Sequence, residues 1–116
     1  ADDDGVIFTS AIVPGANATL EVNASGPTLL QAWVDFNADG DWDDAGEQVF
    51  TNQALVAGPN ALLFPVPVSA TVGSTLARFR VSTTSGLGHG GQAPDGEVED
   101  YLIATTPVEL QSFVVE

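Results

Sequence analysis

Short apolar runs, broken by turn-forming residues about every eight to twelve positions, extend along most of this chain. Apolar and polar residues alternate within many of these runs, which places the apolar side chains on one face of an extended strand. Turn residues such as Pro14-Gly15 and Ser25-Gly26-Pro27 separate the runs, and signals of helical period are nearly absent. The pattern predicts an all-β antiparallel β-sandwich, immunoglobulin-like or jelly-roll-like, of about seven or eight strands.

A length of 116 residues fits one domain with one core. We expect a sandwich over residues 1–104, followed in residues 105–116 by a hinge, Thr105-Thr106-Pro107, and a C-terminal strand. Because Pro65 and Pro67 cannot donate to a ladder, the segment around them should be an edge strand or a strand end. The expected strands are Val6–Ser10, Ala18–Ala24, Leu29–Phe36, Gln48–Thr51, Ala61–Val66, Thr75–Ser82, Glu97–Ala104 and Val108–Val115.

The charge is strongly acidic: 16 carboxylate side chains face only two arginines, and the formal net charge is −14. Binding to nucleic acid or to anionic lipid requires Lys and Arg, so neither is an expected partner. No apolar stretch approaches the roughly 20 residues of a membrane span, so we expect no membrane insertion. Bound divalent cations would relieve the self-repulsion, and Ca²⁺ prefers carboxylate oxygens.

In the loop Asp35 to Glu47, oxygen-bearing side chains occupy every second position for five steps, from Asp35 to Asp43. In calcium loops of this kind, ligands alternate around a glycine where the chain turns sharply, and a carboxylate closes the loop at position twelve. Here Gly46 occupies position twelve and Glu47 follows at thirteen, so the loop is a relative of the EF-hand arrangement placed between strands. The predicted Ca²⁺ ligands are Asp35, Asn37, Asp39, Asp41 and Glu47, with Asp43 as a further candidate.

The alternative for this loop is an acidic turn whose carboxylates point into water. We favour a cation, because so many like charges within a dozen residues repel one another. Magnesium demands tighter octahedral geometry and keeps more of its water, so it suits a ligand-rich loop less well than calcium.

A second acidic cluster, around Glu97, Glu99 and Asp100, precedes Tyr101. Arg78 and Arg80 lie on one face of their predicted strand, and an arginine–carboxylate ladder to Glu97 and Glu99 is the favoured interpretation. Asp100 shares a face with Val98 and Leu102, which would half bury it and favour a second metal or a buried hydrogen-bond partner.

Two tryptophans, Trp33 and Trp42, flank the first acidic loop. Either could form a stacking platform for a sugar, but a strand tryptophan in a sandwich is more often part of the core. Chance carboxylate pairs on an acid-rich surface do not indicate a glycosidase, and the chain leaves little room for a deep cleft, so we expect no enzymatic activity.

Three motifs in order carry a resemblance to a known family: Ala32-Trp-Val-Asp-Phe-Asn-Ala-Asp-Gly-Asp-Trp-Asp-Asp-Ala-Gly-Glu47, then Ala77-Arg-Phe-Arg80, then Gly96-Glu-Val-Glu-Asp-Tyr101. Together they resemble the GEVED domain, a module of large secreted and surface proteins of bacteria. Asp2-Asp-Asp-Gly-Val6 and Val13-Pro-Gly15 also resemble the start of the family, so the resemblance runs from about Asp2 to Ile103.

The resemblance implies an extracellular β-sandwich module with a calcium loop and no known catalysis, found beside adhesive, matrix or hydrolase domains. We therefore expect a secreted or cell-surface protein from which any signal peptide has been removed. In a bacterial source, the glycosylation sequons at Asn17 and Asn23 would be coincidental.

Two functions remain open at this stage. The segment Val108 to Val115 alternates as a strand after a proline hinge, so it could join the sheet of a neighbouring subunit and build a homopolymer or filament. Alternatively, the chain could be a carbohydrate-binding or adhesive module that holds a polysaccharide on Trp33, Trp42 or Tyr101 beside the calcium loop.

Overall fold

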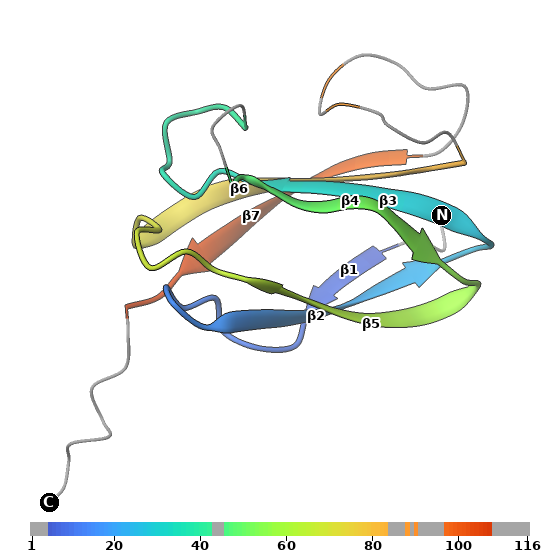
Figure 1. Cartoon of the computed structure of the whole chain (residues 1–116), viewed down its shortest axis with the longest axis horizontal. Coiled ribbons are helices and arrows are strands. Elements are labelled where there is room, and N and C mark those ends of the chain that lie inside the picture. The colour runs from blue at the N-terminus through green and yellow to red at the C-terminus, as the bar shows by residue number, and fades with distance from the viewer. Residues whose placement is uncertain (1–4, 43–45, 84–87, 89, 91–96, 108–116) are drawn as a thin grey trace, which may run out of the picture.

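A computed structural model of the chain describes residues 5–42, 46–83, 88, 90 and 97–107. The described residues form seven strands and no helix, and the all-β prediction is confirmed (Figure 1). No described segment forms a helix of the length and apolarity that crossing a membrane would require. The strands are β1 (Gly5–Phe8), β2 (Asn17–Ala24), β3 (Thr28–Val34), β4 (Gln48–Leu55), β5 (Gly58–Pro65), β6 (Gly73–Ser82) and β7 (Glu97–Thr105).

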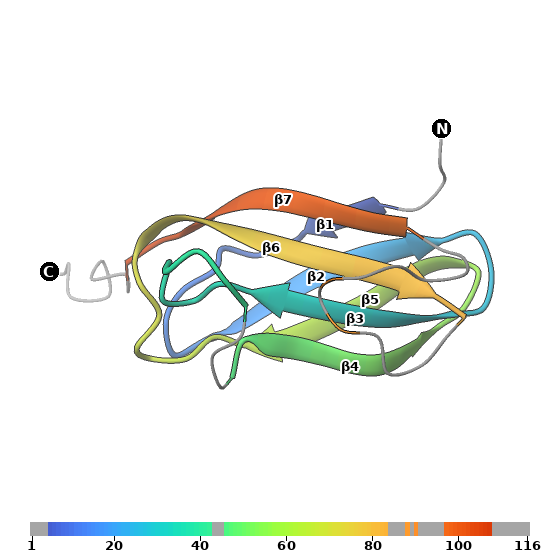
Figure 2. The same ribbon diagram turned by 90° about the horizontal axis from the view of Figure 1, so that it is seen from above.

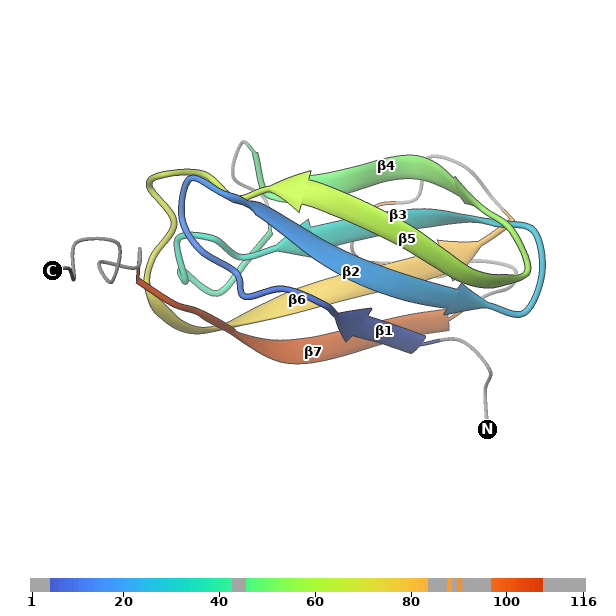
Figure 3. The ribbon, with the colours of Figure 1, turned by 90° about the horizontal axis from the view of Figure 1, so that it is seen from below.

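The strands form two antiparallel sheets that lie face to face (Figure 1). The four-stranded sheet has the order β4-β3-β6-β7 (Figure 2), and the three-stranded sheet has the order β1-β2-β5 (Figure 3). Neighbours β1–β2, β3–β4 and β6–β7 pair within one sheet, while the other connections cross between the sheets. This arrangement is immunoglobulin-like, and it is distinct from the eight-stranded jelly roll.

The core lies between the sheets and is built from alternate residues of the strands. Phe64 of β5 is at its centre, with its ring centroid 6.3 Å from Phe8, 6.3 Å from Phe36 and 6.0 Å from Phe50. Phe79 of β6 is buried beside them, 6.2 Å from Phe8. Such rings each bury a large apolar area, so this aromatic group holds the two sheets together.

The extent of β4 differs from the expected one, because its pairing departs from simple alternation. Strand β4 continues from the predicted Gln48–Thr51 to Leu55, through a bulge where Asn52 has φ 49°. The buried amide of Gln31 fills the bulge, because its Oε1 accepts from Asn52 N at 3.0 Å and its Nε2 donates to Asn52 Oδ1 at 2.5 Å. The bulge reverses the alternation that marks a strand in sequence.

Of the predictions for β5 and for the C-terminal hinge, the first is confirmed and the second is partly wrong. Strand β5 is an edge strand that ends at Pro65, as the prolines predicted. The predicted hinge Thr105-Thr106-Pro107 overlaps β7, because Thr105 is the buried last residue of that strand and pairs with Gly73. Thr106 N donates to Ile12 O at 2.9 Å, so the strand is held at this point too. The expected strand Val108–Val115 lies outside the described residues.

Parts of the outer face of the four-stranded sheet are also buried, including Gln31, Trp33 and Arg80. Gly88 and Gly90, which follow β6 in the chain, lie against this face, and their carbonyls accept from Arg80 at 2.9 and 2.6 Å. A second cover is the acidic loop after β3, which rises above this sheet (Figure 1). The polar side chains of this face therefore fix loops, while the aromatic core fixes the sheets.

Candidate metal centre

The two ends of the acidic loop are brought together by the β3–β4 pair. Asp35 follows β3 directly and Glu47 precedes β4, and Val34 N donates to Glu47 O at 2.8 Å across the base of the loop. Both side chains are buried, with exposed fractions of 5% for Asp35 and 2% for Glu47. Buried carboxylates are rare unless they are paired or bind a metal.

The loop folds back onto the carboxylate of Asp35. Its Oδ1 accepts from Asp39 N at 3.2 Å and its Oδ2 from Gly40 N at 2.9 Å. This reversal needs left-handed backbone, with φ 55° at Ala38 and φ 93° at Gly40. Each carboxylate oxygen has a second lone pair, so both oxygens of Asp35 can still bind a cation.

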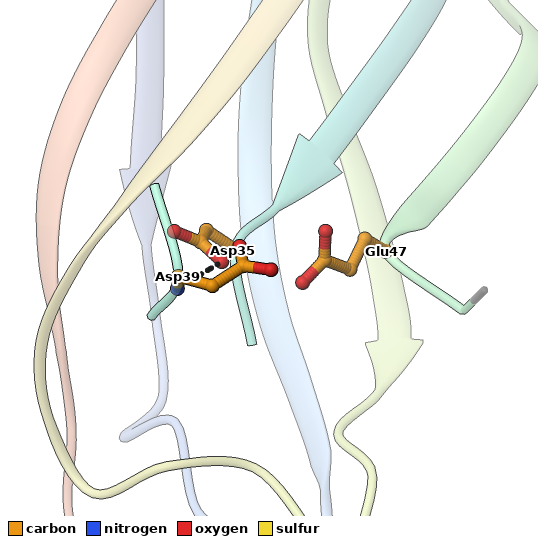
Figure 4. Close-up of side chains that lie close together, drawn as sticks. All are labelled: Asp35, Asp39 and Glu47. Carbon is orange, nitrogen blue, oxygen red and sulfur yellow. Dashed lines mark hydrogen bonds between the residues drawn. The ribbon is translucent and has the colours of Figure 1, made fainter. Parts of the chain in front are cut away.

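Three carboxylates converge at the base of the loop (Figure 4). Asp35, Asp39 and Glu47 each offer one oxygen, and these oxygens lie within 4.8 Å of one another. Two oxygens bound to one Ca²⁺ at 2.3 to 2.6 Å can be at most about 5 Å apart, so the spacing fits a single calcium ion. A buried acidic cluster that could hold a metal ion is thus present where the sequence predicted one.

The other predicted ligands are placed differently. Asp41 does not belong to the group of three, and its backbone N donates to Asp39 Oδ1 at 3.1 Å. Asn37 is an exposed residue of the turn, and Asp43 lies outside the described residues. The structure therefore brings together the first, second and last predicted carboxylates of the loop.

The second acidic cluster differs from the expectation. Asp100, and not Glu99, pairs with an arginine: Arg78 donates from Nε at 2.7 Å and from Nη2 at 2.8 Å. The predicted half-burial of Asp100 is wrong, because its face of β7 is the outer one, where Leu102 is 74% exposed. The hydrogen bonds from Arg78 hold the pKa of Asp100 below its usual range.

Glu99 lies on the opposite face of β7, so Glu99 and Asp100 do not form one metal site. The hydroxyl of Tyr101 donates to Glu99 Oε1 at 2.5 Å and accepts from Val6 N at 3.1 Å. The bond from Val6 N joins β7 to β1 across the two sheets, while the bond to Glu99 lies within β7. The side chain of Glu97 is outside the described part of the chain.

The tryptophans have two different environments. Trp33 is 3% exposed but lies on the outer face of the four-stranded sheet, so it is buried without belonging to the core between the sheets that was expected for it. Trp42 is partly exposed in the acidic loop, and the guanidinium carbon of Arg78 lies 4.7 Å from the centroid of its ring, a cation–π contact.

Two residues of β6 support the loop, and the sequence analysis did not single them out. The hydroxyl of Thr75 donates to Asp35 O at 2.7 Å. The carbonyl of Leu76 accepts from Asp35 N at 3.0 Å and from Trp42 Nε1 at 3.3 Å. No sequence signal could have found them, because strand pairing alone brings β6 beside the end of β3.

Comparison with family models gives a match to the GEVED domain over residues 29–104. This chain belongs to the GEVED domain family. The matched segment runs from β3 into β7 and includes the acidic loop, both arginines and the Gly96-Glu-Val-Glu-Asp-Tyr101 motif. The resemblance noted between Asp2 and Gly15 lies outside it. No curated protein and no solved structure matches the chain.

In this GEVED domain, the described part of the family's motif has side chains on both faces of β7. On one face Tyr101 donates to Glu99 and accepts from Val6 of β1, while on the other Asp100 holds Arg78 against Trp42. The motif therefore has a structural role in this chain, joining the last strand to the first strand and to the acidic loop.

Proposed function

We propose that this GEVED domain is an extracellular, calcium-stabilised structural module without catalytic activity. The observation that carries the proposal is the convergence of Asp35, Asp39 and Glu47, two of them buried, in a protein with a net charge of −14. Calcium is the cation of choice because the ligands are all oxygens and alternate along a turning loop. The extracellular location rests on the family resemblance.

The stabilising effect follows from where the ligands lie. Asp35 and Glu47 sit on the two ends of a loop that closes the β3–β4 pair, so one ion would tie both strand ends together. An ion that binds only the folded state stabilises it by about 2.7 kcal/mol at a hundredfold excess over Kd.

Calorimetric titration of chelator-treated protein with CaCl₂ tests the proposal. We expect saturable binding in the wild type, and loss of that binding in Asp35→Asn and in Glu47→Gln. The matched control is Glu21→Gln, which removes one carboxylate from the other sheet. Absence of calcium binding by the wild type, in protein shown to be folded, would reject the calcium proposal.

Self-assembly is the second part of the proposal. Thr106 N donates to Ile12 O, Pro107 is exposed, and the alternating segment Val108 to Val115 follows in the sequence. We propose that this segment pairs with a neighbouring subunit. Deletion of Val108 to Glu116 should then give a folded monomer; a full-length protein that stays monomeric in light scattering at high concentration would contradict assembly.

We favour a structural role over carbohydrate binding because of the environments of the two tryptophans. Trp33 is buried, and the ring of Trp42 is in cation–π contact with the guanidinium group of Arg78. Retention of the protein on an insoluble polysaccharide, abolished by Trp42→Leu, would support the binding alternative.

A further inference from the structure

Trp42, Arg78 and Asp100 form a stack on the outer face of the four-stranded sheet. Asp100 of β7 is the direct neighbour of Arg78 of β6 and receives two hydrogen bonds from it, at 2.7 and 2.8 Å. The guanidinium held in this way lies 4.7 Å from the ring centroid of Trp42. The stack therefore connects the edge strand β7 to a residue in the acidic loop.

The same loop is fixed to β6 at a second level, through one carbonyl group. Leu76 O accepts from Asp35 N and from Trp42 Nε1, at 3.0 and 3.3 Å. The first residue of the loop and its tryptophan are thus held on the same point of β6. Between these two fixed points lie Asn37 to Gly40, which are exposed, and Asp39 among them supplies one of the three convergent carboxylates.

We propose that the Trp42–Arg78–Asp100 stack positions the acidic loop for its ion, and that Asp100 is a positioning residue and not a metal ligand. The proposal rests on the proposed calcium function. A loop that is held in its binding conformation loses less entropy when the ion binds, so the stack strengthens binding without touching the ion. Asp100 acts through Arg78, because both of its oxygens receive hydrogen bonds from that side chain.

The experiment compares calcium affinity in full-length wild type, Asp100→Asn, Asp100→Glu, Trp42→Leu and the double variant Asp100→Asn/Trp42→Leu. We expect about tenfold weaker calcium binding in Asp100→Asn. This loss is at the low end of the losses in metal affinity that follow when residues supporting metal ligands are substituted. Asp100→Glu should retain part of the affinity that Asp100→Asn loses, since its carboxylate can still pair with Arg78. The double variant should lose little more than the weaker-binding single variant, because the two residues act as one unit.

Charge effects are separated from positioning by two controls. Glu21→Gln removes one negative charge from the other sheet and should keep wild-type affinity within about twofold, since salt screens charges that are separated by more than a Debye length. Trp42→Leu changes no charge, so weaker binding in this variant cannot be electrostatic. In 1 M KCl, where the Debye length is about 3 Å, the loss in Asp100→Asn should persist.

A readout without calcium tests the positioning itself. Because Trp33 is buried and Trp42 is partly exposed, acrylamide quenching of tryptophan fluorescence reports mainly on Trp42. Quenching should rise in calcium-free Asp100→Asn and stay unchanged in Glu21→Gln. Unchanged quenching would overturn the positioning role whether or not the wild type binds calcium. If Asp100→Asn shows increased quenching but binds calcium with wild-type affinity, the claim that the stack strengthens calcium binding is wrong. If the wild type binds no calcium, both that claim and the proposed function are rejected.

Discussion

Asp100 accepts two hydrogen bonds from Arg78, from Nε at 2.7 Å and from Nη2 at 2.8 Å, across the neighbouring strands β6 and β7. Bidentate hydrogen bonds of this kind, between a guanidinium and a carboxylate, are among the strong ion-pair geometries in proteins. In a chain with only two arginines, this pair commits one of them to the outer face of the sheet. It also gives the protein a defined dependence on pH.

The hydrogen bonds from Arg78 lower the pKa of Asp100 in the folded state. A lowered folded pKa contributes stability that is present above the unfolded value, about 3.9, and is lost as the pH falls through the folded pKa. The wild type should therefore be more stable than Asp100→Asn at pH 6 by less than about 1 kcal/mol, since the pair is partly solvated. The difference should shrink below pH about 4. Urea denaturation of the wild type and of Asp100→Asn, at pH 6 and below pH about 4, measures this difference in stability. A difference in stability that grows in acid would contradict the prediction.

Glu47→Gln should have effects of opposite sign with and without calcium. Without the ion, the substitution removes one of the close, buried carboxylates and should raise the melting temperature of chelator-treated protein. With excess calcium, the wild type should gain stability that the variant does not gain. Scanning calorimetry in chelator and in calcium measures both, with Glu21→Gln as the control. A variant that is less stable than the wild type in chelator would show that repulsion does not govern the apo state.

Gly40→Ala should destabilise the protein by about 1 to 2 kcal/mol. Gly40 has φ 93°, and an added Cβ would meet no atom within 4 Å, so the cost is confined to the backbone conformation. Gly26→Ala is the matched control, because Gly26 also has open space but no left-handed φ. Equal denaturation midpoints for the two variants would contradict this account of the turn.

Phe64→Ala should cost about 3 to 5 kcal/mol of unfolding free energy, because it opens a cavity beside the rings of Phe8, Phe36 and Phe50. Its neighbour Leu63 points to the opposite face and is exposed, so Leu63→Ala should change stability by less than about 0.5 kcal/mol. Chemical denaturation of the pair tests the assignment of the faces of β5. A larger loss in Leu63→Ala would indicate that this outer face is covered by a partner.

Tyr101→Phe should remove the hydroxyl that bridges β7 and β1. It leaves Val6 N and the carboxylate of Glu99 without that partner, at a cost of about 1 kcal/mol. Hydrogen exchange should accelerate at Val6 more than at residues of β3. Uniform acceleration across both sheets would point to global destabilisation and would contradict the local role.

The sequence alone determined the fold class, because alternation and turn residues act locally and each strand must bury one face whatever its partner is. It also located the acidic cluster that could hold a metal ion, since Asp35 and Asp39 are near in the chain and fall at alternate loop positions. Tertiary structure decided the pairings. Arg78 is bound to Asp100 and not to Glu99 because the register of β6 and β7, which depends on packing between sheets, sets which residues face each other. The support of Asp35 by Thr75 likewise follows from strands that are distant in sequence and adjacent only in the folded sheet.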